Sequence, residues 1–301
     1  MTLTFRQLHP HFVGEASAMD LRRVEDPETL SAIRRGLDEY AVVIFHDQRF
    51  TNEEQLAFAQ RFDGRIHTKS ATATLFGKNR FGYEGISDVS NVNADNEIMQ
   101  RDDRRRMSMM TNRLWHTDAS FQDPPGRYSM LSARVIPPSG GDTEFADMRA
   151  AYDALDADMK AKLEGLRVFH SITYNKQVLG FEISQLEAEK LKGAVHPLVL
   201  TLPRTGRRSL YLAAHTAHVV DWPVAEGRLL LRDLTEHATQ KAFVYRHVWR
   251  QHDFVIWDNR STMHRGRPFE DTAHRRELVR TTTLDDELSA IAANRAATAA
   301  S

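Results

Sequence analysis

The sequence contains no cysteine among its 301 residues. This absence excludes disulfide bonds and thiolate catalysis, and it means that any metal site must use nitrogen and oxygen ligands. The chain also lacks an apolar run near the ~20 residues that span a bilayer, and it does not begin with a basic segment followed by an apolar stretch. We therefore expect a cytoplasmic protein that makes no contact with membranes.

An excess of charge of either sign is missing as well. The 40 Lys and Arg residues are balanced by 41 Asp and Glu residues, which leaves a formal net charge of -1. The Arg-rich stretches are interrupted by acidic residues and by segments typical of strands, so the sequence predicts no broad basic surface for nucleic acid. A small molecule is the expected partner, and the sequence leaves a homo-oligomeric assembly open.

The chain also lacks an internal linker. No stretch rich in proline, glycine or serine divides it, and no internal repeat is visible. Length alone favours about two domains, but all-β enzymes often reach this length as one. We expect a single domain over residues 1–289. Residues 290–301 are rich in alanine and have no large apolar side chain after Ile291, which predicts a frayed helix or a disordered tail.

The sequence predicts helices in several places. A helix over 26–40 begins at an Asp-Pro dipeptide, which is typical of a helix start. Thr51 and Glu54 form a possible capping box for a second helix. Hydrophobic periodicity indicates further helices over 148–166, broken near its middle, and over 224–239.

Segments typical of strands outnumber these helices and do not alternate with them as in a parallel α/β protein. Strands are expected over 41–45, 128–136, 143–145, 168–174, 199–202, 210–213, 243–249 and 254–257. This pattern favours a mainly β fold with flanking helices. The expected architecture is a double-stranded β-helix of the jelly-roll, cupin-like type.

The segment Trp115-His116-Thr117-Asp118 holds a histidine and an aspartate two residues apart. On a strand, both side chains project to the same face and can reach one metal ion. With 14 His in the chain, this pattern alone is more often an ordinary polar pair, and a third ligand must come from elsewhere; His264 is the candidate. Two imidazoles and one carboxylate on one side of a metal are typical of non-haem Fe(II) oxygenases. Zinc hydrolases use similar ligands.

A strand rich in arginine follows His264. Residues 274–282 read His-Arg-Arg-Glu-Leu-Val-Arg-Thr-Thr, and two-residue alternation places Arg276 and Arg280 on one face. Two inward guanidinium groups are unfavourable without anions, whereas arginine binds a carboxylate through two parallel hydrogen bonds. We therefore expect two acidic ligands, a dicarboxylate cosubstrate and an acidic substrate.

Ordered blocks of sequence extend this pattern across nearly the whole chain. They include LWHTDASF at 114–121, RYSMLSA at 127–133, PPSGGDTEF at 137–145, DMRAAYDAL at 147–155, PVAEGR at 223–228, WDNR at 257–260, HRGR at 264–267 and TTLDD at 282–286. On these blocks the chain resembles the taurine/2,4-dichlorophenoxyacetate family of Fe(II)- and 2-oxoglutarate-dependent dioxygenases. Within that family it is most similar to the phenoxyacetate branch.

The resemblance implies which residues hold the metal and the cosubstrate. Fe(II) would be held by three ligands, His116, Asp118 and His264. Thr143 and Arg276 would bind the distal carboxylate of 2-oxoglutarate, with O₂ as the second cosubstrate. The loop before Arg276 is one residue longer than the family spacing, which makes Arg275 the alternative. The Arg-Arg-Glu-Leu match and the strand alternation both favour Arg276.

The substrate pocket follows less directly from the sequence. By resemblance, Arg280 matches a position that pairs with the acidic substrate, and Asn112 matches a residue that lines the same pocket. Lys69 and His67 are further candidates to reach the substrate acid, but a surface position is favoured for both. The charged and Met-rich segment 95–110 predicts either a mobile lid or a solvated loop whose Met residues pack on the barrel.

The activity implied by the resemblance is hydroxylation of a small acidic substrate. With an aryloxyalkanoate such as 2,4-dichlorophenoxyacetate, ether cleavage would give a phenol and glyoxylate, and 2-oxoglutarate would release succinate and CO₂. Taurine, another alkylsulfonate or a natural aromatic acid is an alternative substrate for the same chemistry. A non-catalytic metal-binding β-barrel and a zinc hydrolase are alternatives of a different class.

Overall fold

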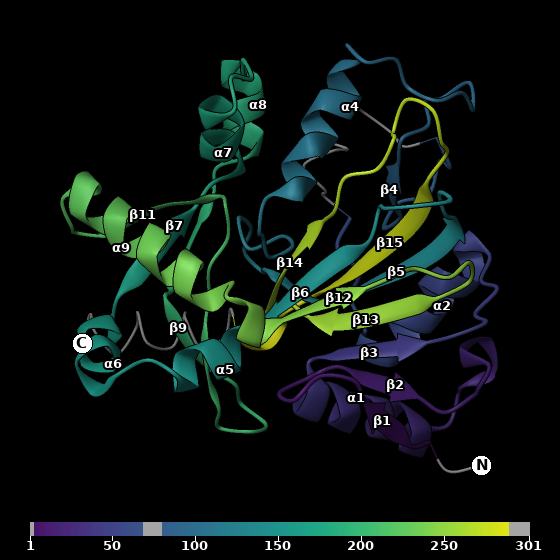
Figure 1. The fold of residues 1–301 in the computed structure, drawn as a ribbon, viewed down its shortest axis with the longest axis horizontal. Coiled ribbons are helices and arrows are strands. Elements are labelled where there is room, and N and C mark those ends of the chain that lie inside the picture. The colour runs from purple at the N-terminus through teal and green to yellow at the C-terminus, as the bar shows by residue number, and fades with distance from the viewer. Residues whose placement is uncertain (1–2, 69–79, 289–301) are drawn as a thin grey trace.

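The computed structural model describes residues 3–68 and 80–288. Its largest sheet has seven strands. Its strands are β1 (Phe5–Gln7), β2 (Gly14–Ala16), β3 (Val42–Phe45), β4 (Ser87–Ser90), β5 (Gly126–Val135), β13 (Phe254–Asp258) and β15 (Glu277–Leu284). The order across the sheet is β1-β2-β3-β13-β5-β15-β4 (Figure 1). Strands from both ends of the described chain therefore lie side by side.

Lys69 and the predicted tail at 290–301 lie outside the described residues. The expectation of a single domain over residues 1–289 stays a prediction.

A smaller three-stranded sheet faces the larger one. It contains β6 (Thr143–Asp147), β12 (Val244–His247) and β14 (Thr262–Gly266) in the order β12-β6-β14. Phe145 of this sheet packs in one buried cluster with Leu131, Trp257 and Leu278 of the larger sheet. Two facing sheets with a shared core confirm the predicted jelly-roll architecture, and their strand pairs are antiparallel except for the parallel pair of β2 and β3.

Two helices cover the outer face of the larger sheet, α1 (Pro27–Tyr40) and α2 (Asn52–Asp63) (Figure 1). Asp26 caps α1 through a hydrogen bond from the backbone N–H of Thr29 at 2.8 Å. Thr51 and Glu54 form the predicted capping box of α2. The two helices bury one apolar stripe each against β3, β5 and β13.

The middle of the chain covers the outer face of the smaller sheet. Helices α5 (Met148–Asp153), α6 (Ala157–Leu163) and α9 (Val224–Ala238) share a core with Ala146 and Met263 of that sheet. The predicted helix over 148–166 is thus broken, as expected. Short strands complete this layer: β7 (Arg167–His170), β8 (Ala194–Pro197), β9 (Val199–Thr201), β10 (Arg208–Leu210) and β11 (Thr216–Val219).

Three short helices lie at one end of the molecule, α4 (Arg104–Met109), α7 (Ile172–Val178) and α8 (Gln185–Lys190) (Figure 1). The strand predicted over 168–174 was wrong in its second half, because the Ser171 hydroxyl accepts a hydrogen bond from the backbone N–H of Tyr174 and starts α7 there. Within the described ranges, no helix is long and apolar enough to cross a membrane.

Candidate functional site

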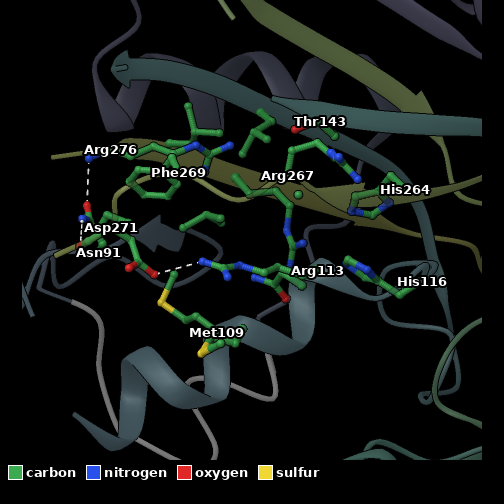
Figure 2. A pocket seen from close by; sticks show the side chains of 18 of the residues that line it. Asn91, Met109, Arg113, His116, Thr143, His264, Arg267, Phe269, Asp271 and Arg276 are labelled. Atoms are coloured by element: carbon green, nitrogen blue, oxygen red, sulfur yellow. Dashed lines mark hydrogen bonds and ion pairs between the residues drawn. The ribbon is translucent and has the colours of Figure 1, made fainter. Parts of the chain in front are cut away.

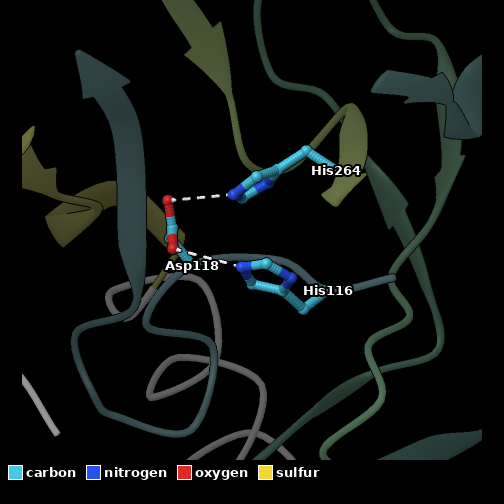
Figure 3. Close-up of side chains that lie close together, drawn as sticks. All are labelled: His116, Asp118 and His264. Carbon is cyan, nitrogen blue, oxygen red and sulfur yellow. Dashed lines mark ion pairs between the residues drawn. The ribbon is translucent and has the colours of Figure 1, made fainter. Parts of the chain in front are cut away.

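Two histidines and one aspartate meet between the two sheets (Figure 3). Nε2 of His116 lies 3.9 Å from one carboxylate oxygen of Asp118, and Nε2 of His264 lies 3.7 Å from the other. Their potential ligand atoms all lie within 4.8 Å of one another. In the described part of the chain, this is the one cluster of His and acidic residues whose geometry suits a metal ion.

The segment that carries His116 and Asp118 is not the strand that the sequence predicts. His116 makes an isolated antiparallel bridge with His264 of β14, through backbone hydrogen bonds of 3.0 and 2.8 Å. Asp118 lies in the turn that follows. Thr117 points the other way, and its hydroxyl donates to the backbone carbonyls of Leu212 and Thr262. One bridge is therefore enough to bring the two imidazoles together.

Neighbouring polar groups fix the orientation of the three side chains. Nδ1 of His116 lies 2.8 Å from the carbonyl oxygen of Leu114, so it carries the proton and leaves Nε2 free as a metal ligand. The Ser129 hydroxyl donates to Asp118 at 2.7 Å, and the Asn259 side chain donates to Ser129 at 3.0 Å. Such outer contacts hold metal ligands in place.

The protonation states of the three groups suit a metal ion. Burial lowers the pKa of His116, and burial lowers the pKa of His264 well below its usual value. Burial alone raises the pKa of Asp118, but the Arg280 guanidinium and the two imidazoles hold that pKa well below its usual range. The site therefore offers two neutral imidazoles and an ionised carboxylate, the forms in which these residues bind metals.

A cavity opens on one side of the cluster and is called here the Arg276 cavity (Figure 2). Its wall includes Thr143, Phe269, Arg276 and Leu278 together with His116 and His264. Arg276 and Leu278 line the same cavity as Arg280, which agrees with the predicted two-residue alternation. Arg275 instead bonds to Glu277 and to Asn96.

The Arg276 side chain makes one hydrogen bond to the described residues. Its Nε donates to the carbonyl oxygen of Gly141 at 3.0 Å, and no described residue accepts a hydrogen bond from its terminal nitrogens. Burial lowers its pKa to about 10, against the opposing effect of Asp142. Gly141 has φ +73, and a Cβ there would lie 3.0 Å from Cδ and Nε of Arg276. The glycine therefore leaves the room that the guanidinium fills.

Thr143 lines the same cavity as Arg276. Its Oγ1 accepts a hydrogen bond from the Trp249 indole N–H at 3.0 Å. Because a hydroxyl has one proton to donate, and no described residue accepts it, that proton is available to a ligand in the Arg276 cavity. Trp249 was not recognised in the sequence, where nothing marks its side chain as a partner of Thr143.

A second cavity on the other side of the cluster is called here the Lys176 cavity. Its wall includes Lys176, His215, Phe121, Ile172 and Thr282. It shares four residues with the Arg276 cavity, which lie between the two: Met109, Asn112, His116 and Arg280. The structure thus places Asn112 and Arg280 where both cavities meet the candidate metal cluster.

Arg280 differs from the sequence expectation in one respect. Its guanidinium forms an ion pair with the carboxylate of Asp118. A substrate acid would therefore not be its only partner. The pairing was not visible in the sequence, because Arg280 and Asp118 are 162 residues apart. Its charge is therefore shared with a candidate metal ligand.

A buried group of imidazoles supports the far wall of the Lys176 cavity. The Ser120 hydroxyl lies 2.6 Å from Nε2 of His215 and 2.8 Å from Nδ1 of His170. His196 Nε2 donates to the backbone carbonyl of Ser120 at 2.8 Å. Burial lowers the pKa of His215 to about 3, so these rings are neutral and act as hydrogen-bonding groups.

The charged segment 95–110 forms part of the wall instead of an isolated loop. Arg105 pairs with Asp88 at 2.9 Å, and Arg106 pairs with Asp271 at 2.8 Å. Met109 lines both cavities, whereas Met107 is 42% exposed. His67 is buried and lines the Lys176 cavity, so the surface position considered for it was wrong.

Residues 4–282 of the chain match the family described as "Taurine catabolism dioxygenase TauD, TfdA family". The chain is 45% identical over 291 residues to the alpha-ketoglutarate-dependent 2,4-dichlorophenoxyacetate dioxygenase of Cupriavidus pinatubonensis, covering 95% of this chain and 99% of that protein. It is 35% identical to the (S)-phenoxypropionate/alpha-ketoglutarate-dioxygenase of Sphingobium herbicidovorans, covering 79% of this chain and 80% of that protein.

A solved structure gives the same picture at the level of the fold. The crystal structure of AAD-2 in complex with Mn(II) and N-oxalylglycine has a TM-score of 0.87 to this chain at 44% sequence identity. The match covers 96% of this chain and 99% of that chain. The similarity therefore extends over both sheets and over the segments that line the two cavities.

Proposed function

This chain belongs to the taurine catabolism dioxygenase TauD, TfdA family, and we propose that it is an Fe(II)- and 2-oxoglutarate-dependent dioxygenase that oxidises a small aryloxyalkanoate such as 2,4-dichlorophenoxyacetate. Its relatives named above are alpha-ketoglutarate-dependent dioxygenases of phenoxy acids. The products would be a phenol and glyoxylate from the substrate, and succinate and CO₂ from 2-oxoglutarate.

One observation carries the proposal: two cavities with cationic walls meet at a cluster of two neutral imidazoles and one carboxylate. Three protein ligands on one side of a metal leave the other positions open for a keto acid and O₂. A dicarboxylate and a second acid can then lie on opposite sides of the cluster. His116, Asp118 and His264 are the residues that would hold the iron.

The residues of the chain supply binding and orientation. Arg276 and the free hydroxyl proton of Thr143 would bind the distal carboxylate of 2-oxoglutarate. Ser129 and Asn259 keep Asp118 oriented. When bound, Fe(II) and 2-oxoglutarate together supply the capacity to activate O₂ and to insert oxygen into a C–H bond. The protein places the substrate carbon next to that chemistry.

The walls of the Lys176 cavity favour an acidic substrate with an apolar body. Phe121, Ile172 and Met109 offer apolar contacts, while Lys176 and Arg280 supply positive charge. An aryloxyalkanoate has both features, because its ring is apolar and its other end is a carboxylate. A taurine-like sulfonate has the acid group without the large apolar part, which makes it the weaker candidate.

The proposal is tested by an assay of succinate formation with purified, Fe(II)-loaded protein. A panel of 2,4-dichlorophenoxyacetate, phenoxypropionate, a cinnamate and taurine is offered with 2-oxoglutarate and O₂. We expect succinate in step with a phenol product for the phenoxy acids and much less turnover of taurine. Taurine turnover above that of every aromatic acid would contradict the proposed substrate class.

A second measurement tests the cofactor separately from the substrate. Anaerobic addition of Fe(II) and 2-oxoglutarate should produce the visible charge-transfer band of the chelate. Zn(II) in place of Fe(II) should give neither the band nor O₂ consumption, which separates the dioxygenase from a zinc hydrolase. Action in the cytoplasm stays a prediction for this enzyme.

A further inference from the structure

Lys176 is a lysine in an unusual position. It lies on α7, and only 4% of its surface is exposed. Lysine is almost never fully buried unless it is paired. The sequence does not mark Lys176 as buried, because it lies beyond the end of the strand predicted over 168–174 and no local pattern distinguishes it from a surface lysine.

The hydrogen bonds of Lys176 are all to neutral oxygens, and its Nζ also lies 5.1 Å from the centroid of the Phe181 ring in a cation–π contact. Its Nζ donates to the backbone carbonyl of Ser108 at 2.9 Å, to the Ser108 hydroxyl at 2.5 Å and to the Thr111 hydroxyl at 3.3 Å. Among the described residues, no carboxylate forms an ion pair with it. Burial lowers its pKa to about 8, so the ammonium group remains mostly charged at neutral pH.

The charges around the Lys176 cavity do not balance. The described residues of its wall include two cations, Lys176 and Arg280, and one carboxylate, Asp118. Arg280 is already paired with Asp118. Burial lowers the pKa of His67 and the pKa of His215, so these two wall histidines add no charge. One positive charge, that of Lys176, is therefore left without a counter-ion.

Leaving a buried charge without a counter-ion is unfavourable. The hydrogen bonds that join the residue 176 side chain to Ser108 and Thr111 do not require a charged donor, because a neutral amide could donate to the same oxygens. The Phe181 ring stabilises the ammonium group but does not neutralise it, so the positive charge remains available to an anion that enters the cavity. The contact to Thr111 is the longest of the three, so its N–H is the donor most easily turned toward a ligand.

We propose that Lys176 is a specificity-determining residue, which provides the positive charge that attracts the acid group of the substrate into the Lys176 cavity. Arg280 is shared between that acid group and Asp118. This inference rests on the proposed function, because it assigns a partner to the substrate of that reaction. It adds to the enzyme a second cation for the substrate, contributed by a helix outside the two sheets.

The test removes the charge without removing the hydrogen-bond donor. Lys176→Gln keeps an N–H group, Lys176→Arg keeps the charge, and Lys190→Gln neutralises an exposed lysine at the end of α8 as a matched control. Dissociation constants for 2,4-dichlorophenoxyacetate and its uncharged amide, 2,4-dichlorophenoxyacetamide, are measured by anaerobic calorimetry with Fe(II) and 2-oxoglutarate present. Melting temperatures report whether each variant is folded.

We expect Lys176→Gln to weaken binding of the carboxylate at least about tenfold and binding of the amide by less than about twofold. Lys176→Arg and Lys190→Gln should keep the preference for the acid. An unchanged ratio of acid to amide affinity in Lys176→Gln would overturn the inference, and so would an equal loss for both ligands, which indicates a purely structural contact.

The outcome is distinguishable from failure of the proposed function. If the wild-type protein forms succinate with phenoxy acids but Lys176→Gln keeps the acid preference, only the inference on Lys176 fails. If the wild-type protein forms no succinate with any acid of the panel, the proposed function fails and the inference fails with it.

Discussion

The Arg276 cavity and the Lys176 cavity share one wall but are built from different kinds of structure. Arg276 directly precedes β15, its backbone N–H donates to the Asn91 side chain at 2.8 Å, and its partner Thr143 starts β6. Lys176 lies on the short helix α7 and reaches across to the segment that contains α4. The cation of the first cavity is held by the sheets, and that of the second by short helices.

This difference separates two tasks. Strand register is set by many backbone hydrogen bonds, so it holds the cosubstrate side of the site in a fixed geometry. Short helices joined by a few side-chain contacts can change without disturbing the sheets. Under the proposed function, cosubstrate binding therefore depends on the barrel, and we expect substrate preference to depend on the helices at its end.

The largest expected effect on activity comes from a change in the cluster that both cavities share. His264→Ala removes a ligand from the cluster that the cavities share, so we expect loss of iron binding and a fall in turnover of more than about 100-fold. Metal analysis after dialysis and the chelate band measure the first, and succinate formation the second. His218→Ala, on β11 outside both cavities, is the matched control. Full iron content in His264→Ala would rule out its role as a ligand.

The second prediction affects the Arg276 cavity alone. Arg276→Ala should raise the concentration of 2-oxoglutarate needed for half-maximal rate by roughly 30-fold or more, because a buried partner of a carboxylate contributes about 2 kcal/mol or more. The affinity for the phenoxy acid should change little. Arg275→Ala is the control, since Arg275 is held by Glu277 and Asn96. If Arg275→Ala has the larger effect, the cosubstrate residue is Arg275.

The smallest effect is expected at the boundary between the cavities. Arg280→Ala should weaken binding of the phenoxy acid about tenfold, less than for an unshared buried charge, because Asp118 already neutralises part of its charge. The 2-oxoglutarate requirement and the iron content should be preserved. Arg232→Ala, at an exposed position of α9, serves as control. A phenoxy acid affinity equal to that of the wild type would leave Lys176 as the cation that binds the substrate.

Local sequence patterns predicted much of the fold. The Asp-Pro start of α1, the capping box of α2 and the break between α5 and α6 are local signals, and each is present in the structure. The predicted strand over 168–174 failed because its β-branched and aromatic residues favour a strand, whereas one Ser171 cap starts α7. Short elements are decided by such single contacts.

The amino-acid sequence by itself determined the chemistry available to this protein. The absence of cysteine, the His-x-Asp pair and a second histidine restrict the metal ligands, and the alternating arginines indicate acidic ligands. Its ordered blocks were also sufficient to indicate the family, which the comparisons confirm. These are properties of residue type and short-range spacing.

Only the tertiary structure decided how charges are distributed around the cluster. Three features depend on residues far apart in the chain: the ion pair of Arg280 with Asp118, the hydrogen bond from Trp249 to Thr143 and the contact of the buried Lys176 with Ser108. Spacing cannot predict them, because the cost or benefit of a charge depends on whether water or another charged group surrounds it. That environment exists only after the sheets and the short helices have packed together.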